Sequence, residues 1–312
     1  MYGDEQLMLA TQDIQSQQSR LVQGEIEPSG SWTARLDLDF NVASMERMDE
    51  SHASKTRLGF QHVGPLRIQK ALYPEGPSIC HAIVVHPPGG IAGGDRLEVI
   101  VKSRMHSHGL VTNPSATKWY GTDLGVRASQ LIDIALDGKF EWLPQETIVF
   151  NHARVRSDIQ VRASAQGAMI GWDHLIFGRH ASGEIFASGT FNQTLTIELE
   201  GQEVWRDKLV LQGSDPLFAS PIGLRGHHAL ATIWAILPDS KSWSEAMIES
   251  LRSHSGSSPD QCIAWSVIHP RLLVGRVLAN PLKLKSLLHS AWDFLRPHVL
   301  DRIAVAPRLW AT

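Results

Sequence analysis

The clearest pattern along the chain is the alternation of apolar and polar residues between Trp32 and Val42. Apolar residues hold the even positions of this stretch and polar residues hold the odd ones. Side chains of a β-strand point alternately to its two faces, so the pattern predicts a strand with one buried and one exposed face. Similar alternation, or a short apolar run, predicts further strands at residues 66–68, 79–85, 97–101, 132–136, 147–150, 155–165, 169–177, 183–191, 195–199, 204–211, 228–237, 263–268 and 272–278.

Turn-forming residues indicate how some of these strands pair. Asp137-Gly138 follows the strand at 132–136 and is typical of a β-hairpin. Glu200-Gly201 predicts a second pairing, between residues 195–199 and 204–211. Residues 169–177 and 183–191 are expected to form a third pair.

Two helices are predicted in the last third of the chain. Ser242 and Glu245 have the spacing of a capping box, which predicts a helix that ends near His254. Asn280 followed by Pro281 is typical of a helix N-terminus, and the leucines that follow recur with a helical period. With about fifteen predicted strands and two helices, we expect a mainly β protein.

Length and composition limit the domain organisation. The chain has 312 residues and is 43% hydrophobic, which is enough for a sizeable core. Residues 1–30 are rich in Gln, Ser and Glu and are predicted to form a flexible N-terminal extension. No later change in composition divides the chain, so residues 31–312 are expected to form a single β domain.

Charge and targeting signals exclude several classes of function. The net charge of −3 gives no electrostatic reason to expect binding to nucleic acid or to an anionic membrane. No apolar run approaches the ~20 residues that cross a bilayer, and no secretory signal is recognised. The two cysteines lie within apolar runs, which argues against a disulfide framework. We therefore expect a cytoplasmic location.

A loop rich in glycine and proline, residues 86–95, separates two predicted strands. Its composition excludes a helix or strand interior and predicts a tight connection. A phosphate-binding loop would need a Lys and a following helix, and this stretch has neither. Asp95 at its end would also repel phosphate, so a nucleotide-binding module is disfavoured.

No catalytic motif of a common hydrolase is present in the sequence. Asp133, Glu141 and Glu146 could form a carboxylate pair, although such scattered acids are usually structural. The groups Cys80-His81 with His86, His106 with His108, and His227-His228 could contribute metal ligands. None has the spacing of a closed four-ligand site, so structural histidines are the favoured interpretation. Lys118-Trp119-Tyr120 combines charge with aromatic rings, which fits either an interface or buried packing.

An ordered set of short motifs resembles one known family, the urease accessory proteins UreD, also called UreH. The motifs run from about residue 32 to the last residues. They are Gly64-Pro65-Leu66-Arg67-Ile68-Gln69, Tyr73-Pro74-Glu75-Gly76, Cys80-His81, His86-Pro87-Pro88-Gly89-Gly90 with Gly94-Asp95, Ala116-Thr117-Lys118-Trp119-Tyr120, Glu141-Trp142-Leu143-Pro144-Gln145-Glu146-Thr147-Ile148-Val149-Phe150, Gly178-Arg179, Ala181-Ser182-Gly183-Glu184 and Pro307-Arg308-Leu309-Trp310. His152 departs from the expected pattern, and residues 1–30 lie outside it.

The resemblance implies a scaffold and chaperone for nickel insertion, and not an enzyme. It implies a many-stranded, β-helix-like body of stacked sheets with two helices. It also implies binding to the urease apoprotein and to UreF, which recruits the GTPase UreG, within a dimeric assembly. Nickel would pass through transiently, with no tightly bound cofactor. The alternative is a free-standing metal-binding hydrolase on a β scaffold.

Two groups of residues are assigned roles as hypotheses. His86, Asp95 and Glu146 are polar residues within family-like runs, and we expect them near a transient nickel path. Lys118, Trp119 and Tyr120 are expected to contact a partner protein.

Overall fold

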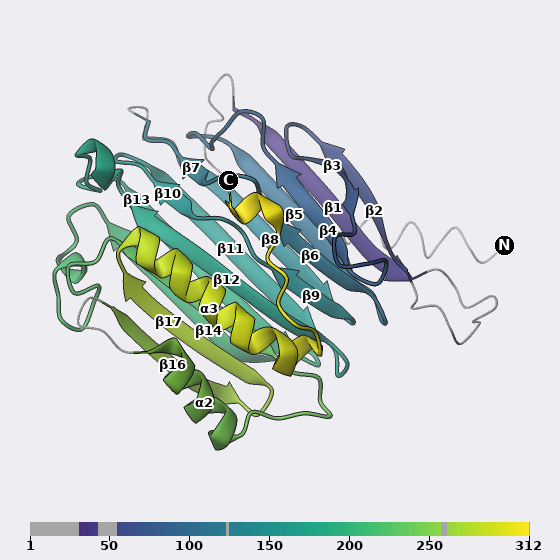
Figure 1. The fold of residues 1–312 in the computed structure, drawn as a ribbon. Coiled ribbons are helices and arrows are strands. Elements are labelled where there is room, and N and C mark those ends of the chain that lie inside the picture. The colour runs from purple at the N-terminus through teal and green to yellow at the C-terminus, as the bar shows by residue number, and fades with distance from the viewer. Residues whose placement is uncertain (1–30, 43–54, 123–124, 257–260, 312) are drawn as a thin grey trace, which may run out of the picture.

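The computed structural model describes residues 31–42, 55–122, 125–256 and 261–311. The described strands form two sheets that lie face to face, and two α-helices cover the outer face of one of them (Figure 1). This confirms the predicted mainly β body of stacked sheets with two helices. The predicted extension at residues 1–30 lies outside the described residues.

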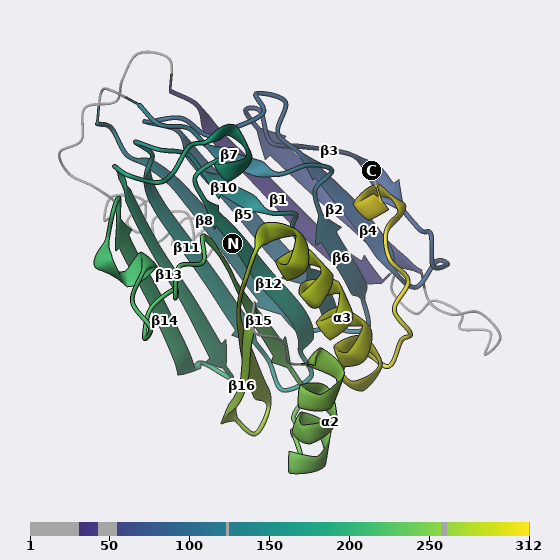
Figure 2. The same cartoon turned by 60° about the vertical axis from the view of Figure 1, so that its left-hand side comes forward.

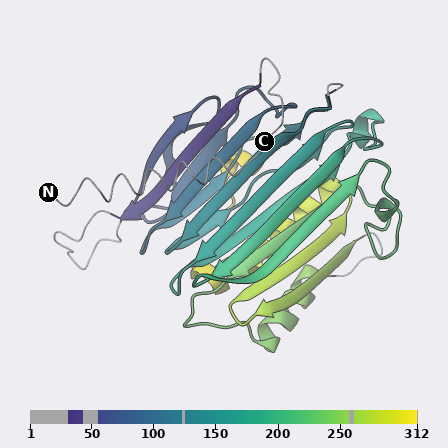
Figure 3. The same cartoon turned by 180° about the vertical axis from the view of Figure 1, so that it is seen from behind.

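The seven-stranded sheet is seen from its outer face in Figure 3. Its strand order is β14-β13-β11-β8-β5-β1-β2. The bounds are β1 (Thr33–Val42), β2 (Thr56–Val63), β5 (Arg96–Ser103), β8 (Ala128–Leu136), β11 (Arg154–Ala163), β13 (Thr190–Leu199) and β14 (Gln202–Gln212).

The ten-stranded sheet carries the helices on its outer face (Figure 2). Its main order is β16-β17-β15-β12-β9-β6-β4-β3, and β10 joins β12 to β7 beside this path. The bounds are β3 (Arg67–Leu72), β4 (Cys80–Val85), β6 (His108–Thr112), β7 (Thr117–Trp119), β9 (Lys139–Trp142), β10 (Thr147–Val149), β12 (Ala168–Phe177), β15 (Ala229–Ile236), β16 (Cys262–His269) and β17 (Leu272–Ala279). The helices are α2 (Glu245–Ser255) and α3 (Pro281–Leu300), with short 3₁₀ turns at His180–Ser182, Pro216–Phe218 and Arg308–Ala311.

From β4 to β13 the chain winds alternately between the two sheets. Successive strands of the same sheet, such as β5 with β8 and β8 with β11, are therefore parallel. In the other sheet β4, β6, β9 and β12 are parallel in the same way. Parallel neighbours require a crossover, and here each crossover passes through the opposite sheet. The result is a β-helix-like winding.

The two ends of this winding differ. Tight turns join the strands at one end. Longer connections, at residues 86–95, 120–122 with 125–127, 178–189 and 213–228, lie together at the other end. We call the second one the loop end.

Two of the predicted pairings are wrong. Asp137-Gly138 joins β8 to β9, which lie in different sheets. The Gly138 amide instead donates to Ser103 in the turn of the previous winding (2.9 Å), and the Gly138 carbonyl accepts from Ala168 in the next (3.0 Å). The pairing of residues 169–177 with 183–191 fails as well, because residues 183–189 lie in a connection and β13, which begins at Thr190, lies in the sheet opposite β12. A turn sequence indicates that the chain changes direction, but it does not indicate in which sheet the next strand lies.

Other local predictions are confirmed or shifted slightly. The pairing across Glu200-Gly201 is confirmed as the antiparallel pair β13–β14. The Asn280 cap is confirmed, since Asn280 Oδ1 accepts from the Lys283 amide at 2.9 Å. The first helix begins at Glu245, later than predicted, because Ser244 and not Ser242 accepts from the Met247 amide.

Two apolar cores result from this layering. One lies between the sheets, and the other lies between the ten-stranded sheet and the helices. Strand β12 separates them and is buried along its whole length. Its Met169, Leu175 and Phe177 face the core between the sheets, while Ile170 and Trp172 face the helices.

A buried ionic cluster fastens α3 to the sheet beneath it. Arg296 of α3 and Glu141 of β9 are both fully buried. The Arg296 guanidinium donates to Glu141 at 3.0–3.2 Å and to Glu75, before β4, at 2.6 and 2.8 Å. His108 Nε2 lies 2.8 Å from Glu141 Oε1, and His81 Nε2 lies 2.8 Å from Glu75 Oε1.

The electrostatics of this cluster follow from its hydrogen bonds. Burial alone would raise the pKa of Glu75, but hydrogen bonds from His81 and Arg296 lower it to about 2. In Glu141 burial again opposes ionisation, and contacts with His108 and Arg296 lower the pKa. Both carboxylates are therefore held ionised around one guanidinium.

We predict that Arg296→Met destabilises the protein by about 3–5 kcal/mol, because it leaves two buried carboxylates without their cation. Adding Glu141→Gln to Arg296→Met should recover part of this loss, since the two residues are coupled. The free energy of unfolding from urea titrations measures both effects. Arg302→Met, at an exposed position after the same helix, is the matched control and should change stability by less than about 0.5 kcal/mol. Losses that simply add in the double variant would contradict this role.

Candidate functional site

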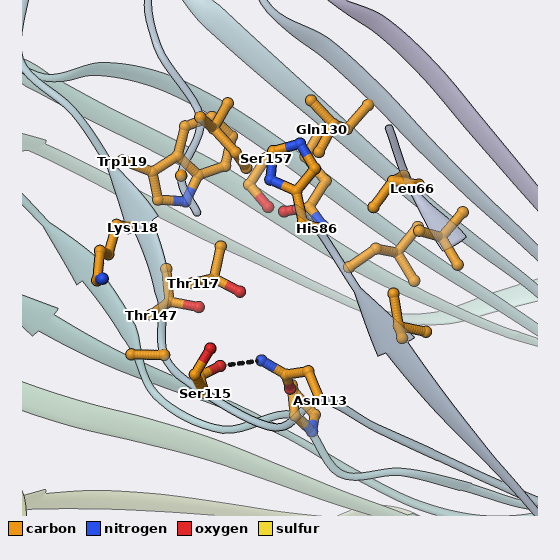
Figure 4. A pocket seen from close by; sticks show the side chains of 18 of the residues that line it. Leu66, His86, Asn113, Ser115, Thr117, Lys118, Trp119, Gln130, Thr147 and Ser157 are labelled. Atoms are coloured by element: carbon orange, nitrogen blue, oxygen red, sulfur yellow. Dashed lines mark hydrogen bonds between the residues drawn. The ribbon is translucent and has the colours of Figure 1, made fainter. Parts of the chain in front are cut away.

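A cavity of about 210 Å³ lies between the two sheets and reaches the segments 84–91 and 111–119 (Figure 4). It begins where β4 and β6 end and β7 begins, so its outer wall is made by loops and short strands. Its inner wall is made by strands of the seven-stranded sheet and by β12. The cavity thus penetrates the core between the sheets.

Four polar residues line this cavity at positions where a sandwich core is normally apolar. They are Gln130 of β8, Ser157 of β11, Asp173 of β12 and Gln193 of β13. Each lies on the same inward-facing side of its strand as the buried apolar residues two positions away. Gln130, for example, lies on the same face of β8 as Ile132. Polar groups at such positions destabilise a core unless they are satisfied or used.

Asp173 carries the strongest electrostatic signature in the cavity. Its Oδ2 accepts a hydrogen bond from Gln193 Nε2 at 2.5 Å. Burial raises the pKa of Asp173 to about 6, and the bond from Gln193 opposes that rise only in part. A carboxyl group of this kind exchanges its proton in the range where an entering cation can compete for it.

His86 lies at the end of β4 and lines the same cavity (Figure 4). Its Nε2 is buried and has no hydrogen-bond partner among the described residues. Burial lowers the pKa of His86, and the nearby charge of Asp95 opposes this. The imidazole is therefore neutral near pH 7, which is the form that binds metal ions.

Asp95 is occupied by backbone contacts. Its Oδ1 accepts from the Trp32 amide and its Oδ2 accepts from the Ala92 amide, each at 2.8 Å. The side chain is buried. These bonds fix the glycine-rich loop to the start of β1. Asp95 influences His86 through its charge and does not line the cavity.

Glu146 lies beside the cavity between two of its lining residues, Pro144 and Thr147. Its backbone carbonyl accepts from the Thr117 amide, and its buried Oε2 has no hydrogen-bond partner among the described residues. The structure therefore places His86 and Asp95 near one another, while Glu146 does not itself line the cavity. Their role in a nickel path stays a prediction.

The predicted partner-contacting residues also belong to the cavity region. Trp119 is buried and lines the cavity, while Lys118 is half-buried at its edge (Figure 4). Tyr120 packs edge-on against Phe150 with ring centroids 5.0 Å apart. In this structure their packing is internal for the most part, and their contact with a partner stays a prediction.

The other candidate metal residues are dispersed. His81 and His108 belong to the ionic cluster, and Cys80 faces the core between the sheets. Among the described residues, no group of three or more His, Cys, Asp or Glu side chains could hold a metal ion. The ligands near the cavity are thus separated from one another.

Sequence reasoning missed Asp173 and Gln193. The signal was available, because Asp173 is the acid within the run from Met169 to Phe177, which is apolar apart from Asp173 and His174. Its significance depends on which face of β12 it occupies, and this needs the register of the sheet.

Comparison with known proteins then identifies the family. A model of the UreD urease accessory protein family matches residues 33–311. The chain belongs to this family. It is 38% identical over 297 residues to the urease accessory protein UreD of Dechloromonas aromatica, covering 94% of this chain and 99% of the relative.

Further UreD relatives agree over nearly the same length. The protein from Janthinobacterium sp. (strain Marseille) is 38% identical over 89% of this chain and 91% of its own. The protein from Pseudomonas aeruginosa is 37% identical over 90% and 96%, respectively. The comparisons give no support to the hydrolase alternative. Among the described residues, neither helix of this chain combines the length and the apolar character that a membrane crossing requires.

We predict that Asp173→Asn stabilises the protein at neutral pH and not at acidic pH. The folded state binds the Asp173 proton more tightly than the unfolded state does, so this group favours folding below about pH 4 and loses that contribution as the pH rises to about 6. A shift from 3.8 to about 6 corresponds to up to about 3 kcal/mol above pH 7. Asn removes the charge and keeps an acceptor for Gln193.

Urea titrations of wild type and variant at pH 4 and pH 8 measure this difference. Asp293→Asn, at an exposed position of α3, is the control and should leave the pH dependence unchanged. The same pH dependence in the wild type and in Asp173→Asn would contradict the buried, proton-exchanging role of Asp173.

Proposed function

We propose that this protein is a urease maturation factor that binds the urease apoprotein and conveys nickel to it through the cavity between the two sheets. Family membership supports the urease role. The observation that carries the conduit is the row of polar side chains along an otherwise apolar core, from His86 to Asp173. Within this proposal UreF binds the protein and recruits UreG in a dimeric, cytoplasmic assembly, as the family resemblance implies.

The chemistry of the cavity suits passage rather than storage of an ion. A neutral imidazole and a carboxylate are both ligands for nickel, and amide and hydroxyl oxygens can replace part of its hydration shell. Ligands that are separated from one another bind an ion weakly at each step, whereas a closed four-ligand site would retain it. Among the described residues, the cavity has separated ligands and no closed metal site.

Proton exchange at Asp173 gives the path a means of charge compensation. Its pKa near 6 means that the carboxyl can be protonated when the cavity is empty and ionised when a cation is beside it. A divalent ion in a buried site needs such a compensating charge, because an uncompensated charge is strongly disfavoured there. The neutral His86 adds a ligand without adding repulsion.

We predict that the combined variant His86→Ala, Glu146→Ala, Asp173→Asn lowers the nickel content of urease matured under limiting nickel. The three changes remove the buried ligand atoms at or beside the cavity without opening the sheets. Metal analysis of purified urease, co-expressed with its accessory proteins and with either wild type or variant, measures the effect.

Asp95 is better tested alone. Asp95→Ala leaves the Trp32 and Ala92 amides without their acceptors, so a loss of nickel loading there would also reflect a loosened loop. A thermal unfolding midpoint no lower than that of wild type is required of each variant. Asp293→Asn again serves as the control. Normal loading by the well-folded triple variant would contradict a path through this cavity.

A further inference from the structure

One flank of the sandwich combines free sheet edges with unbalanced positive charge. The edge strands there are β2 of one sheet and β3 of the other (Figure 1). Each pairs on one side alone within the described residues, β2 with β1 and β3 with β4. We call this surface the basic flank and define it by the basic side chains Lys55, Arg57, His62, Arg67 and Lys70 together with the exposed apolar side chains Trp32, Phe60, Val63 and Leu72.

The charge of this flank is opposite in sign to that of the whole chain. Residues 55–72 contain four Lys and Arg and no Asp or Glu, in a protein whose net charge is −3. Among the described residues, Arg67 and Lys70 form no ion pair with a carboxylate. The contact of the Arg67 guanidinium is with His62 Nε2 of β2, at 2.8 Å. The opposite flank differs, because β14 there carries acids that pair with arginines, as in Asp207 with Arg276.

Apolar side chains are exposed at the same place. Phe60 is 41% exposed, Trp32 is 53% exposed and Val63 is 66% exposed. Phe60 and His62 alternate with outward-facing residues, so they point toward the second sheet. They stay exposed because, in the part of the chain that the structure describes, β2 has no neighbouring strand on its second side.

Free edges are often protected by basic residues, and protection alone is one explanation of this charge. It does not explain the large apolar side chains at the same edge, because exposed apolar residues promote the pairing that protection prevents. A surface with free backbone groups, apolar contacts and one sign of charge has the features of a strand-addition site. The Arg67–His62 contact shows that a basic side chain of β3 reaches the inward face of β2.

We propose that the basic flank docks an extended, acidic segment of a partner protein, which adds a strand to the edge of β2. Side chains of the added strand that face inward would cover Phe60, and their carboxylates would meet Arg67 and Lys70. Charge complementarity with the unpaired basic residues selects an acidic partner over a second copy of this chain, since two basic flanks repel each other.

The test uses the full-length protein and a fluorescent peptide of alternating Glu and Val, with alternating Lys and Val as its counterpart. Fluorescence anisotropy should show binding of the Glu peptide and no comparable binding of the Lys peptide. Arg67→Glu with Lys70→Glu should weaken binding of the Glu peptide by about tenfold, through the loss of two charge pairs. Arg206→Glu with Lys208→Glu, on the edge strand β14 of the opposite flank, is the matched control and should bind as wild type does.

Hydrogen exchange places the peptide on the structure. Those amides of residues 56–63 that point away from β1 should be exchange-competent in the free protein and protected with the Glu peptide, while the alternate amides that pair with β1 serve as an internal reference. Equal binding of the two peptides, wild-type binding by the flank variant, or protection of these amides before the peptide is added would each overturn the proposal. The last result would mean that the edge is already covered, by this chain or by a second copy. Lys70→Glu alone replaces the double variant if that variant unfolds.

This experiment is independent of urease, so its failure leaves the nickel-transfer proposal standing. A capture assay with purified urease apoprotein then asks whether urease supplies the acidic segment. Weaker capture by the flank variant assigns the segment to urease. Unchanged capture, with the peptide result intact, assigns it to another partner.

Discussion

Arg296 is buried between two carboxylates, Glu141 and Glu75, and this contact determines how the helical layer lies on the sheets. The three residues come from α3, from β9 and from the segment before β4, so one guanidinium joins parts of the chain that are far apart in sequence. A buried cation with two ionised partners allows little variation in geometry, because any displacement leaves a charge unpaired. Helix α3 thereby covers the outer face of the ten-stranded sheet over β12, β15 and β17. The core between the two sheets is then the place where polar side chains can line an internal cavity.

The cavity is a consequence of how that sheet is built. β6 and β9 pair over residues 108–111 and 139–142, after which the chain diverts into the short strands β7 and β10. The diversion leaves the ends of β4 and β6 without continuous cover from their own layer. Residues that face inward from the seven-stranded sheet, such as Gln130 and Ser157, then line a space instead of packing against apolar neighbours. The winding thus produces a cavity wall made of strands, and a wall of this kind holds its polar groups at fixed positions.

The strands and helices were largely readable from the sequence because burial on one face leaves a period in the residues. The alternation in residues 32–42 and the leucines after Asn280 both became elements with the predicted faces. Strand β2 was not predicted, since an edge strand exposed on both faces has no such period. The turn at Asp137-Gly138 led to a wrong pairing, because a turn that joins strands of different sheets and a β-hairpin turn use similar residues. For the cavity, His86 was found through its place in a family motif. Asp173 was missed because its importance depends on tertiary register, and residue type alone does not give that register.

The buried titratable groups on the two sides of β12 respond to acid in opposite directions. On the cavity side, burial raises the pKa of Asp173, so acid removes an unfavourable charge. On the helix side, burial lowers the pKa of His174 to about 3 and that of His289 to about 4. As the pH falls below the ordinary histidine value near 6.5, protonation favours the unfolded state at these two sites. In the folded protein Asp173 takes up its proton near pH 6, whereas His289 and His174 take up theirs near pH 4 and pH 3. The loss of stability from the histidines nevertheless begins below the ordinary histidine value and overlaps the gain from Asp173. The proposed exchange of a proton for a cation at Asp173 would take place near neutrality, where both histidines are neutral. In the folded protein these titrations are separated, so the charge of Asp173 can change while the two histidines on the other side of β12 stay neutral.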